Sequence, residues 1–461
     1  MTPLKHQQEL VNNVKSKKQD KVLLWWGMGS GKTAGAFFLA KEWKDPVKLV
    51  VCPKSLVGMW KEFLLAETND NVTDLTKAKY KVAGPQLKNG KCIPGWYIIN
   101  YDRLQSAFWL GNFKDFTLIL DESSFVKHIT AKRTKIALKL CDKSRHLALL
   151  SGTPCGGKWE DMWTHTQMLG GKSKQSEFLD YYCNRIEIRV NNRKIKIINK
   201  SNPYKNIAQL YTALENHGMY KVETQDCIDL PNSREIDIKV DSSKAYKTFD
   251  DKGAVSIGDT EFAASSVPAT RMALRRLASS YNDEKIDAVS DLLNSTDDRV
   301  IIFHQFQEDA VRLEELCKKL QKPYAIQNGQ RHDLEKSGSN YDKYNNCVCI
   351  VQWQSGGYGL NLQLANVGVY FSLPDSYEAF AQAKARILRN GQRKVVTYYN
   401  ITAKDSIDEK IKEALDKKSS YTDEKFIEDY SRYKDLPKKD SKIEVNITEK
   451  VENNQLMFDF A

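Results

Sequence analysis

The strongest constraint on the fold is a glycine-rich segment, GMGSGKT, at residues 27–33. A short apolar run, VLLWW (22–26), precedes it, and a helical pattern, AGAFFLAKEW, follows it. This order predicts a strand, a phosphate-binding loop and a helix N-terminus, where backbone N–H groups and the helix dipole favour an anion. Lys32 is then placed to reach the β- and γ-phosphates of a nucleoside triphosphate, and the Thr33 hydroxyl to ligate Mg²⁺. The alternative is a glycine-rich turn that precedes an ordinary helix.

One position of this loop departs from the strict pattern G-x-x-x-x-G-K-[ST]. Trp26 stands where the first glycine is expected, and the first glycine of the loop is Gly27. Because GKT still lies between a strand and a helix, the segment favours the nucleotide site. The residues we assign to nucleotide binding are Gly27, Gly29, Ser30, Gly31, Lys32 and Thr33.

A second apolar run ends in two carboxylates, Asp121 and Glu122, within FTLILDESS (116–124). In phosphoryl transfer the first would hold Mg²⁺, often through water, and the second would orient and deprotonate the attacking water. The alternative is an acidic strand end that caps the next helix. Following a phosphate loop, the pair favours hydrolysis of ATP.

Apolar runs alternate with helical patterns in two parts of the chain, which predicts βα units on two parallel sheets and therefore an α/β fold. We expect a first lobe at 1–165, an insertion and connector at 166–285, a second lobe at 286–420 and a flexible tail at 421–461, where charges are dense and large apolar groups are few. Within the insertion, IEIRVNNRKIKII (186–198) reads as a β-hairpin around Asn191-Asn192.

Composition limits the partners and the compartment. The net charge of +11 suits a polyanion. Apolar runs fall short of the roughly 20 residues needed to cross a bilayer, and the N-terminus lacks the layout of a signal peptide. The nine cysteines show no C-x-x-C spacing, which favours reduced thiols over zinc. We therefore expect a soluble, cytoplasmic protein with no membrane contact.

The second half carries further polar motifs. QWQSGGYGLNLQLA (352–365) predicts a glycine loop that includes Gly357, which we assign to nucleotide binding together with Gln382. AFAQAKARILRNGQ (379–392) places Gln382, Arg386 and Arg389 at helical spacings, on one face. Arginines on such a face can stabilise charge on a transferring phosphoryl group, whereas the alternative is a solvated basic face.

In this order the motifs resemble helicase superfamily two, and within it the sucrose-non-fermenting, chromatin-remodeller-like group of DNA-dependent ATPases. HQQELV (6–11) resembles the adenine-contact motif, with Gln7 as the matching residue, and VVCPKSLVGMWKEF (50–63) and LLSGTP (149–154) follow in family order. The resemblance implies two RecA-like lobes with ATP bound between them, and Arg386 and Arg389 completing the site. It also implies backbone contacts to duplex DNA, one of them at Lys54, and tracking along the duplex without strand separation.

The chain departs from the family at several places. Ala385 replaces a glycine, Ser124 replaces a histidine in DESS, and MYKVETQDCIDLP (219–231) resembles the connector before the second lobe but lacks its arginine pair. The short surroundings of the core leave no room for a histone-reading module. The compact form is typical of a phage or bacterial protein, in the cytoplasm of a bacterium or an infected host cell, acting in DNA replication, recombination or repair.

Two peripheral segments suggest partners. The hairpin carries an excess of cations, of which Arg193, Lys194 and Lys196 are our candidates for DNA contacts, although an ordinary solvated hairpin has similar charges. The last residues, QLMFDF (455–460), resemble peptides that bacterial proteins insert into a sliding clamp, with Gln455, Phe458 and Phe460 as the matching positions.

Three functions remain open from the sequence. The first is an ATP-driven motor that moves along duplex DNA. The second is a strand-separating helicase that acts on DNA or RNA. The third is a non-catalytic, nucleotide-gated loader or switch that binds nucleic acid and a clamp-like partner. The complete set Lys32, Asp121, Glu122, Arg386 and Arg389 favours a catalytic protein.

Overall fold

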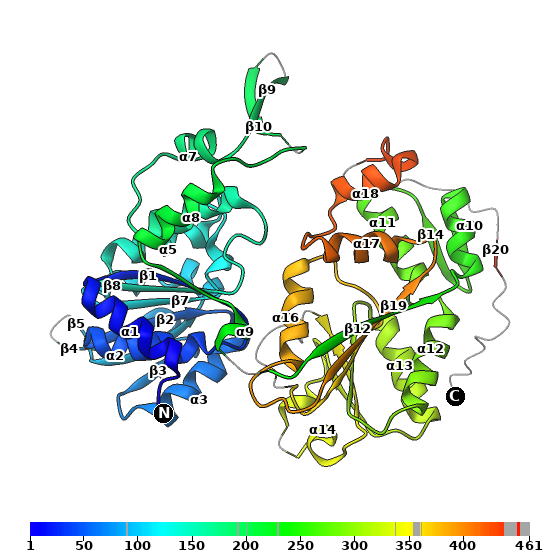
Figure 1. The fold of residues 1–461 in the computed structure, drawn as a ribbon, viewed down its shortest axis with the longest axis horizontal. Coiled ribbons are helices and arrows are strands. Elements are labelled where there is room, and N and C mark those ends of the chain that lie inside the picture. Colours follow the sequence, from blue (N-terminus) through cyan, green and yellow to red (C-terminus); the bar gives the residue numbers. More distant parts are fainter. Residues whose placement is uncertain are drawn as a thin grey trace. The chain divides into compact units, whose positions relative to one another are not determined.

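The computed structural model describes residues 1–88, 91–190, 193–199, 201–227, 230–336, 338–353, 360, 362–437 and 450–451. The chain divides into two compact units, Met1–Asp229 and Leu230–Ala461. Each unit contains a parallel β-sheet with helices beside it, which confirms the predicted α/β class with two lobes (Figure 1). No helix of the described residues is both long and apolar enough to cross a membrane.

The sheet of the first unit has seven parallel strands in the order β11-β1-β8-β7-β2-β6-β3. Its strands are β1 (Lys21–Trp26), β2 (Val47–Cys52), β3 (Val72–Asp74), β6 (Gly95–Asn100), β7 (Thr117–Asp121), β8 (His146–Ser151) and β11 (Met219–Val222). Every residue of β6 and β7 is buried, as expected of continuous apolar strands covered on both faces. The carboxyl ends of these strands share one edge, where ligands of parallel sheets usually bind.

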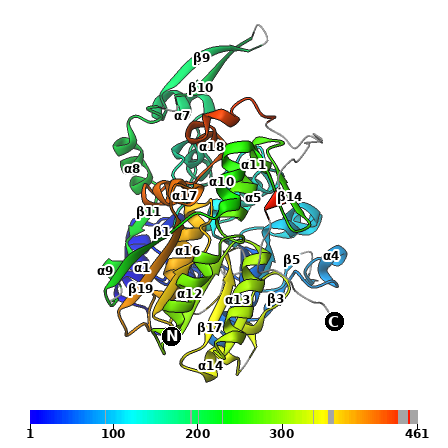
Figure 2. The same ribbon diagram turned by 90° about the vertical axis from the view of Figure 1, so that its right-hand side faces the viewer.

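Helices and short strands complete the first unit. The helices are α1 (Lys5–Lys17), α2 (Lys32–Trp43), α3 (Val57–Glu67), α4 (Tyr80–Ala83), α5 (Lys132–Lys143), α6 (Met162–Met168), α7 (Gln175–Tyr182), α8 (Ile207–Asn216) and α9 (Thr224–Cys227). The unit also contains two separate antiparallel strand pairs. One is β4 (Leu87–Lys88) with β5 (Lys91–Cys92), and the other is the predicted hairpin of β9 (Arg185–Val190) and β10 (Arg193–Ile198). This hairpin extends beyond α7 and α8 in both views (Figures 1 and 2).

The sheet of the second unit has six parallel strands in the order β12-β19-β18-β15-β17-β16. Its strands are β12 (Ser233–Val240), β15 (Val300–His304), β16 (Tyr324–Gln327), β17 (Val348–Gln352), β18 (Val367–Tyr370) and β19 (Val396–Ala403). A smaller sheet contains β13 (Ala254–Ile257), β14 (Thr260–Ala263) and β20 (Lys450–Val451). The helices are α10 (Lys244–Lys252), α11 (Val267–Ala278), α12 (Asp283–Asn294), α13 (Gln307–Lys319), α14 (Asn340–Lys343), α16 (Tyr377–Ile387), α17 (Ile407–Asp416) and α18 (Asp423–Asp429).

Two segments lie elsewhere than their composition suggested. Residues 166–285 are divided between the units, and the part from Leu230 onward supplies β12 to the second sheet and α11 to its core. The first part of the expected tail forms α18 and a 3₁₀ turn, Ser431–Tyr433, and it buries Tyr421, Phe426 and Tyr433 in the core of the second unit. These aromatic side chains anchor a segment whose surface is otherwise charged.

Candidate functional site

The predicted phosphate loop follows β1 and ends at the start of α2. Gly29 and Gly31 have φ angles of 77° and 80°, the left-handed region that glycine adopts without strain. The Lys32 ammonium donates to the carbonyl oxygens of Trp26 and Gly27, both at 3.1 Å, and the Ser30 hydroxyl donates to Gly27 O at 2.7 Å. The loop therefore has the backbone path of a phosphate cradle, with a cation at the helix start.

Helix α1 closes one side of the loop. Gln7 is buried, and its Nε2 donates to Gly31 O at 3.1 Å while its Oε1 accepts from Leu4 N at 2.9 Å. His6 Nε2 lies 2.8 Å from Ser30 O. The structure thus places Gln7 beside the loop, where in this conformation its amide group is bonded to backbone.

The other side of the loop is closed by β11 and the residues after it, a contact that sequence reasoning missed. Gly27 N donates to Val222 O at 2.7 Å, and the Thr224 hydroxyl donates to Met28 O at 2.8 Å. A Cβ atom on Gly27 would lie 2.2 Å from Thr224 Oγ1. Gly27 is therefore required by close approach of the segment that the sequence assigned to the connector.

The carboxylates end β7, which lies two strands away from β1 with β8 between them. Asp121 Oδ2 accepts a hydrogen bond from Trp60 Nε1 on α3 at 2.7 Å, and Oδ1 accepts from Glu122 N at 3.0 Å. Glu122 has a φ of 50°, a left-handed conformation that costs a non-glycine residue on the order of 1–3 kcal/mol. Trp60 was not predicted, although it lies in the VVCPKSLVGMWKEF motif.

A buried histidine holds the next turn. Ser123 Oγ lies 3.1 Å from His165 Nε2 on α6, and both residues are fully buried. Burial lowers the pKa of His165 to about 4, so the imidazole is neutral at pH 7. The backbone that carries Glu122 is therefore anchored by neutral groups.

A magnesium ion bound to a nucleotide takes one or two protein oxygens, and phosphates and waters complete its shell. The Thr33 hydroxyl, at the start of α2, and the Asp121 carboxylate, at the end of β7, supply hard oxygen donors of this kind. No group of three or more His, Cys, Asp or Glu side chains in the described part of the chain forms a separate metal site.

In the second unit, α16 carries Gln382 and Arg386, while Arg389 lies beyond the last helical residue, Ile387. The predicted single helix of 379–392 is therefore shorter than expected. Beyond the helix, the buried Nε2 of Gln392 donates to the carbonyl oxygens of Ala365 at 2.6 Å and Gln363 at 3.1 Å, and it lies 3.4 Å from Ile387 O. Arg389 Nη1 contacts Leu360 O at 3.5 Å, and burial lowers its pKa. Gly357 lies outside the described residues.

Lys54 lies at a polar cavity of about 880 Å³ in the first unit, near the carboxyl ends of β2, β3 and β6. Its charged lining comprises Lys54, Lys61, Lys77, Arg103, Glu62, Asp74 and Asp102. Lys54 itself is exposed, and Arg103 is held by a 3.4 Å bond to Lys77 O. Four cations and three carboxylates share this lining, so its excess of positive charge is small, and the exposed Lys54 is the candidate for a phosphate contact.

Nearby carboxylates neutralise part of the positive charge that the hairpin sequence carries. Lys194 pairs with Glu187 at 2.8 Å, and Lys196 lies 3.4 Å from Asp180, a residue outside the hairpin. The opposite face exposes isoleucines, at positions 186, 195 and 197. The side chain of Arg193 lies outside the described residues, as do Gln455, Phe458 and Phe460.

Two family models match the chain. The SNF2-related domain matches residues 6–291, and the helicase conserved C-terminal domain matches residues 284–391. An uncharacterised ATP-dependent helicase of Mycoplasma genitalium is 23% identical over 448 residues, which cover 89% of this chain and 40% of that protein. One of Bacillus subtilis is 23% identical over 90% of this chain and 78% of its own length. This chain spans less than half the length of the two Mycoplasma relatives.

Similarity also extends to eukaryotic proteins and to solved structures. The SWI/SNF-related matrix-associated actin-dependent regulator of chromatin subfamily A-like protein 1 of Drosophila melanogaster is 24% identical over 85% of this chain and 52% of its own length. The Sulfolobus solfataricus SWI2/SNF2 ATPase core in complex with dsDNA aligns over 90% of this chain and 91% of that chain, at 18% identity and a TM-score of 0.43.

Proposed function

Because this chain belongs to the SNF2-related domain family, whose model matches residues 6–291, we propose that it is a nucleic-acid-dependent ATPase that moves along duplex DNA. The observation that carries the proposal is the shared edge of the first sheet. The phosphate loop follows β1 and the carboxylates end β7, two strands apart in the order β1-β8-β7. Two strand spacings amount to about 10 Å, a span that a triphosphate and its metal ion bridge.

The residues divide into roles within this proposal. Lys32 and the loop backbone bind the phosphates of ATP, Thr33 and Asp121 hold Mg²⁺, and Glu122 activates the attacking water. Gln7 contacts the base after its amide leaves the backbone of the loop. Arg386 and Arg389 stabilise charge on the transferred phosphoryl group, and Gln382 accompanies them. The metal ion supplies charge neutralisation at the phosphates.

Duplex DNA is the substrate that we favour, because the exposed Lys54 lies at the sheet edge and suits a sequence-independent phosphate contact. The hairpin is a second candidate contact. Charge reversal at Arg193, Lys194 and Lys196 is expected to weaken DNA binding and flatten its salt dependence. Unchanged affinity and salt dependence would remove the hairpin from the DNA path.

We also propose a tether at the C-terminus. The QLMFDF segment, with Gln455, Phe458 and Phe460, has the pattern of a sliding-clamp peptide, and the proposal includes a role in DNA replication, recombination or repair. Deletion of residues 455–461 is expected to abolish binding to a bacterial clamp in a pull-down with purified proteins. Equal binding by the truncated chain would contradict this proposal.

The deciding experiment measures ATP hydrolysis by the full chain without nucleic acid and with duplex DNA, single-stranded DNA, forked DNA and RNA. The proposal expects stimulation by blunt duplex, without release of a displaced strand, and its loss in Glu122→Gln. Stimulation confined to single strands or RNA would favour the strand-separating helicase. Absence of hydrolysis under all conditions, with ATP and DNA still bound, would favour the non-catalytic switch.

A further inference from the structure

The second unit buries two cations that no part of the proposed mechanism uses. Lys285 on α12 is fully buried, and its Nζ lies 2.5 Å from Asp408 Oδ2, whose side chain is 4% exposed. Arg275 on α11 is 4% exposed, and its Nη1 donates to Asp375 Oδ2 at 2.7 Å. Each buried ion costs several kcal/mol to remove from water. Even when it is paired, it often stabilises a fold no better than apolar residues do. Their presence therefore calls for another explanation.

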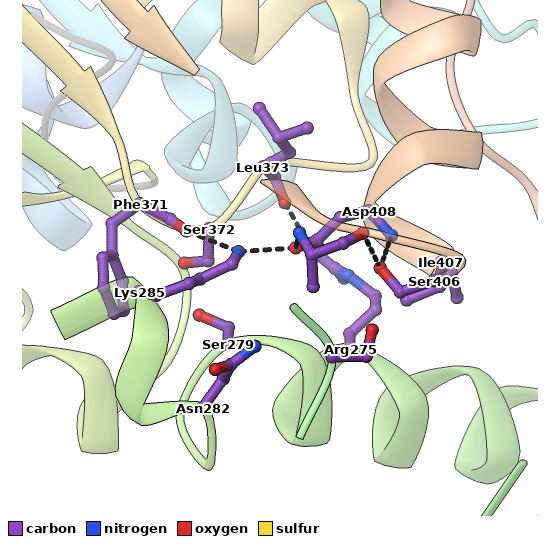
Figure 3. Close-up of polar contacts among 12 residues, drawn as sticks. Arg275, Ser279, Asn282, Lys285, Phe371, Ser372, Leu373, Ser406, Ile407 and Asp408 are labelled. Atoms are coloured by element: carbon purple, nitrogen blue, oxygen red, sulfur yellow. Dashed lines mark hydrogen bonds and ion pairs between the residues drawn. The ribbon is translucent and has the colours of Figure 1, made fainter. Parts of the chain in front are cut away.

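Both cations also bind the same loop. Lys285 Nζ donates to Phe371 O at 2.9 Å, and Arg275 Nη2 donates to Leu373 O at 2.8 Å (Figure 3). The loop at 371–375 follows β18 and leads into α16, whose N-cap is Ser376. Two helices thus fix alternate carbonyl oxygens of one short connection with charged donors, which make stronger hydrogen bonds than neutral ones.

The residue between these carbonyls is held as firmly. Ser372 Oγ donates to Asp309 Oδ2 at 2.6 Å and accepts from Gln305 N at 2.7 Å. Ser372 O accepts from Trp353 Nε1 at 2.7 Å, and Trp353 directly precedes the predicted glycine loop that includes Gly357. At the end of the connection, Asp375 O accepts from Tyr421 N at 2.8 Å.

These contacts connect Trp353, loop 371–375 and the start of α16 in one hydrogen-bonded frame. We propose that Arg275 and Lys285 are positioning residues, which hold loop 371–375 and through it set the position of α16 and its arginine for ATP hydrolysis. The inference rests on the proposed function, because these contacts affect hydrolysis only if Arg386 and Arg389 act on the transferred phosphoryl group. Misplacement of a catalytic group by about 1 Å can reduce turnover about 100-fold, so a rigid mount is worth its desolvation cost.

A merely structural role predicts a different result from a positioning role. Arg275→Met in the full chain is expected to lower kcat for duplex-stimulated hydrolysis about 10- to 100-fold and leave KM for ATP unchanged, because the phosphate loop lies on the first unit. The matched control is Arg276→Met, on the next residue of α11, which pairs with the partly exposed Glu308 at 2.5 Å. Equal kinetics in the two variants would overturn the proposal.

A second variant guards against misfolding of Arg275→Met. The double replacement Lys285→Met with Asp408→Leu removes a buried pair and leaves no unpaired charge, so the fold is retained. The same loss of kcat at constant KM is expected, and wild-type kcat in a folded double variant would overturn the proposal.

Hydrogen–deuterium exchange tests the frame without any need for catalysis. Faster exchange of the α16 amides in Arg275→Met, with unchanged exchange in α2, is expected. Wild-type exchange in α16 would contradict the inference. If the wild-type chain hydrolyses no ATP while Arg275→Met still shows faster exchange in α16, the proposed function alone would be contradicted.

Discussion

The two units hold their candidate catalytic groups in different ways. In the first, neutral donors and acceptors surround the phosphate loop and the turn after Glu122, among them Gln7, Thr224 and the Ser123–His165 pair. In the second, the connection before α16 is fixed by buried charges, Lys285 and Arg275. A neutral hydrogen bond contributes only about 1 kcal/mol net, whereas breaking a buried ion pair costs about 3–5 kcal/mol.

The difference suggests a division of labour. A loop that must accept and release a nucleotide benefits from contacts that exchange at low cost, and the amide of Gln7 and the ammonium of Lys32 are both bonded to backbone that a ligand can replace. A helix that carries a catalytic arginine benefits from strong contacts that hold it in one position. The comparison therefore predicts larger stability losses in the second unit and larger changes in KM for ATP in the first.

The largest expected effect follows from Lys285→Met, which leaves Asp408 buried without its cation. The free energy of unfolding is expected to fall by about 3–5 kcal/mol, measured by urea denaturation followed by circular dichroism. Lys239→Met is the matched control, because Lys239 pairs with Glu409 at 2.7 Å on the surface. Similar losses in both variants would show that the buried pair is no firmer than a surface pair.

The first unit is expected to lose stability as the pH falls. His165 has a folded pKa of about 4, below its ordinary value near 6.5, so the unfolded chain binds a proton that the folded chain excludes. The contribution of neutral His165 to the free energy of unfolding is fully present above pH 6.5. That free energy decreases by about 3 kcal/mol as the pH falls toward 4. Urea denaturation at pH 7 and pH 5 checks this, with His165→Gln expected to reduce the difference. An unchanged pH dependence in that variant would assign it to other groups.

Trp60→Phe removes the neutral indole N–H that donates to the Asp121 carboxylate. Loss of the 2.7 Å bond to Asp121 Oδ2 is expected to cost about 2 kcal/mol of unfolding free energy. It is also expected to weaken Mg²⁺-dependent hydrolysis, because the carboxylate loses its orientation. Trp43→Phe is the control, since that indole donates to a backbone carbonyl of Gln19 at 3.2 Å. Equal Mg²⁺ dependence in the two variants would exclude an orienting role for Trp60.

The comparison also separates what the sequence predicts from what it hides. The strands and the phosphate loop are predictable because continuous apolar runs and GKT are local signals, and Asp121 falls at a strand end for the same reason. Strand β11 is hidden, because it has four residues and pairs with a strand some 200 residues earlier in the chain. Arg275 and Lys285 lie in charged segments, RMALRR and NDEK, which carry no local sign of burial, and only tertiary packing shows them buried. Helix α16 ends at Ile387, so Arg389 lies off the helix although the spacing of the charged residues continues past that point.

The smallest effect concerns Thr224, the contact that ties β11 to the phosphate loop. Thr224→Val keeps the shape of the side chain but removes the 2.8 Å bond to Met28 O, so the loop loses one neutral restraint worth about 1 kcal/mol. KM for ATP is expected to rise about 5-fold with little change in kcat, because a 1 kcal/mol change in binding corresponds to that factor. Thr224→Ser keeps the hydroxyl and is expected to behave as wild type. A fall in kcat at constant KM in Thr224→Val, the signature expected of Arg275→Met, would mean that the two units do not divide binding and turnover between them as their contacts suggest.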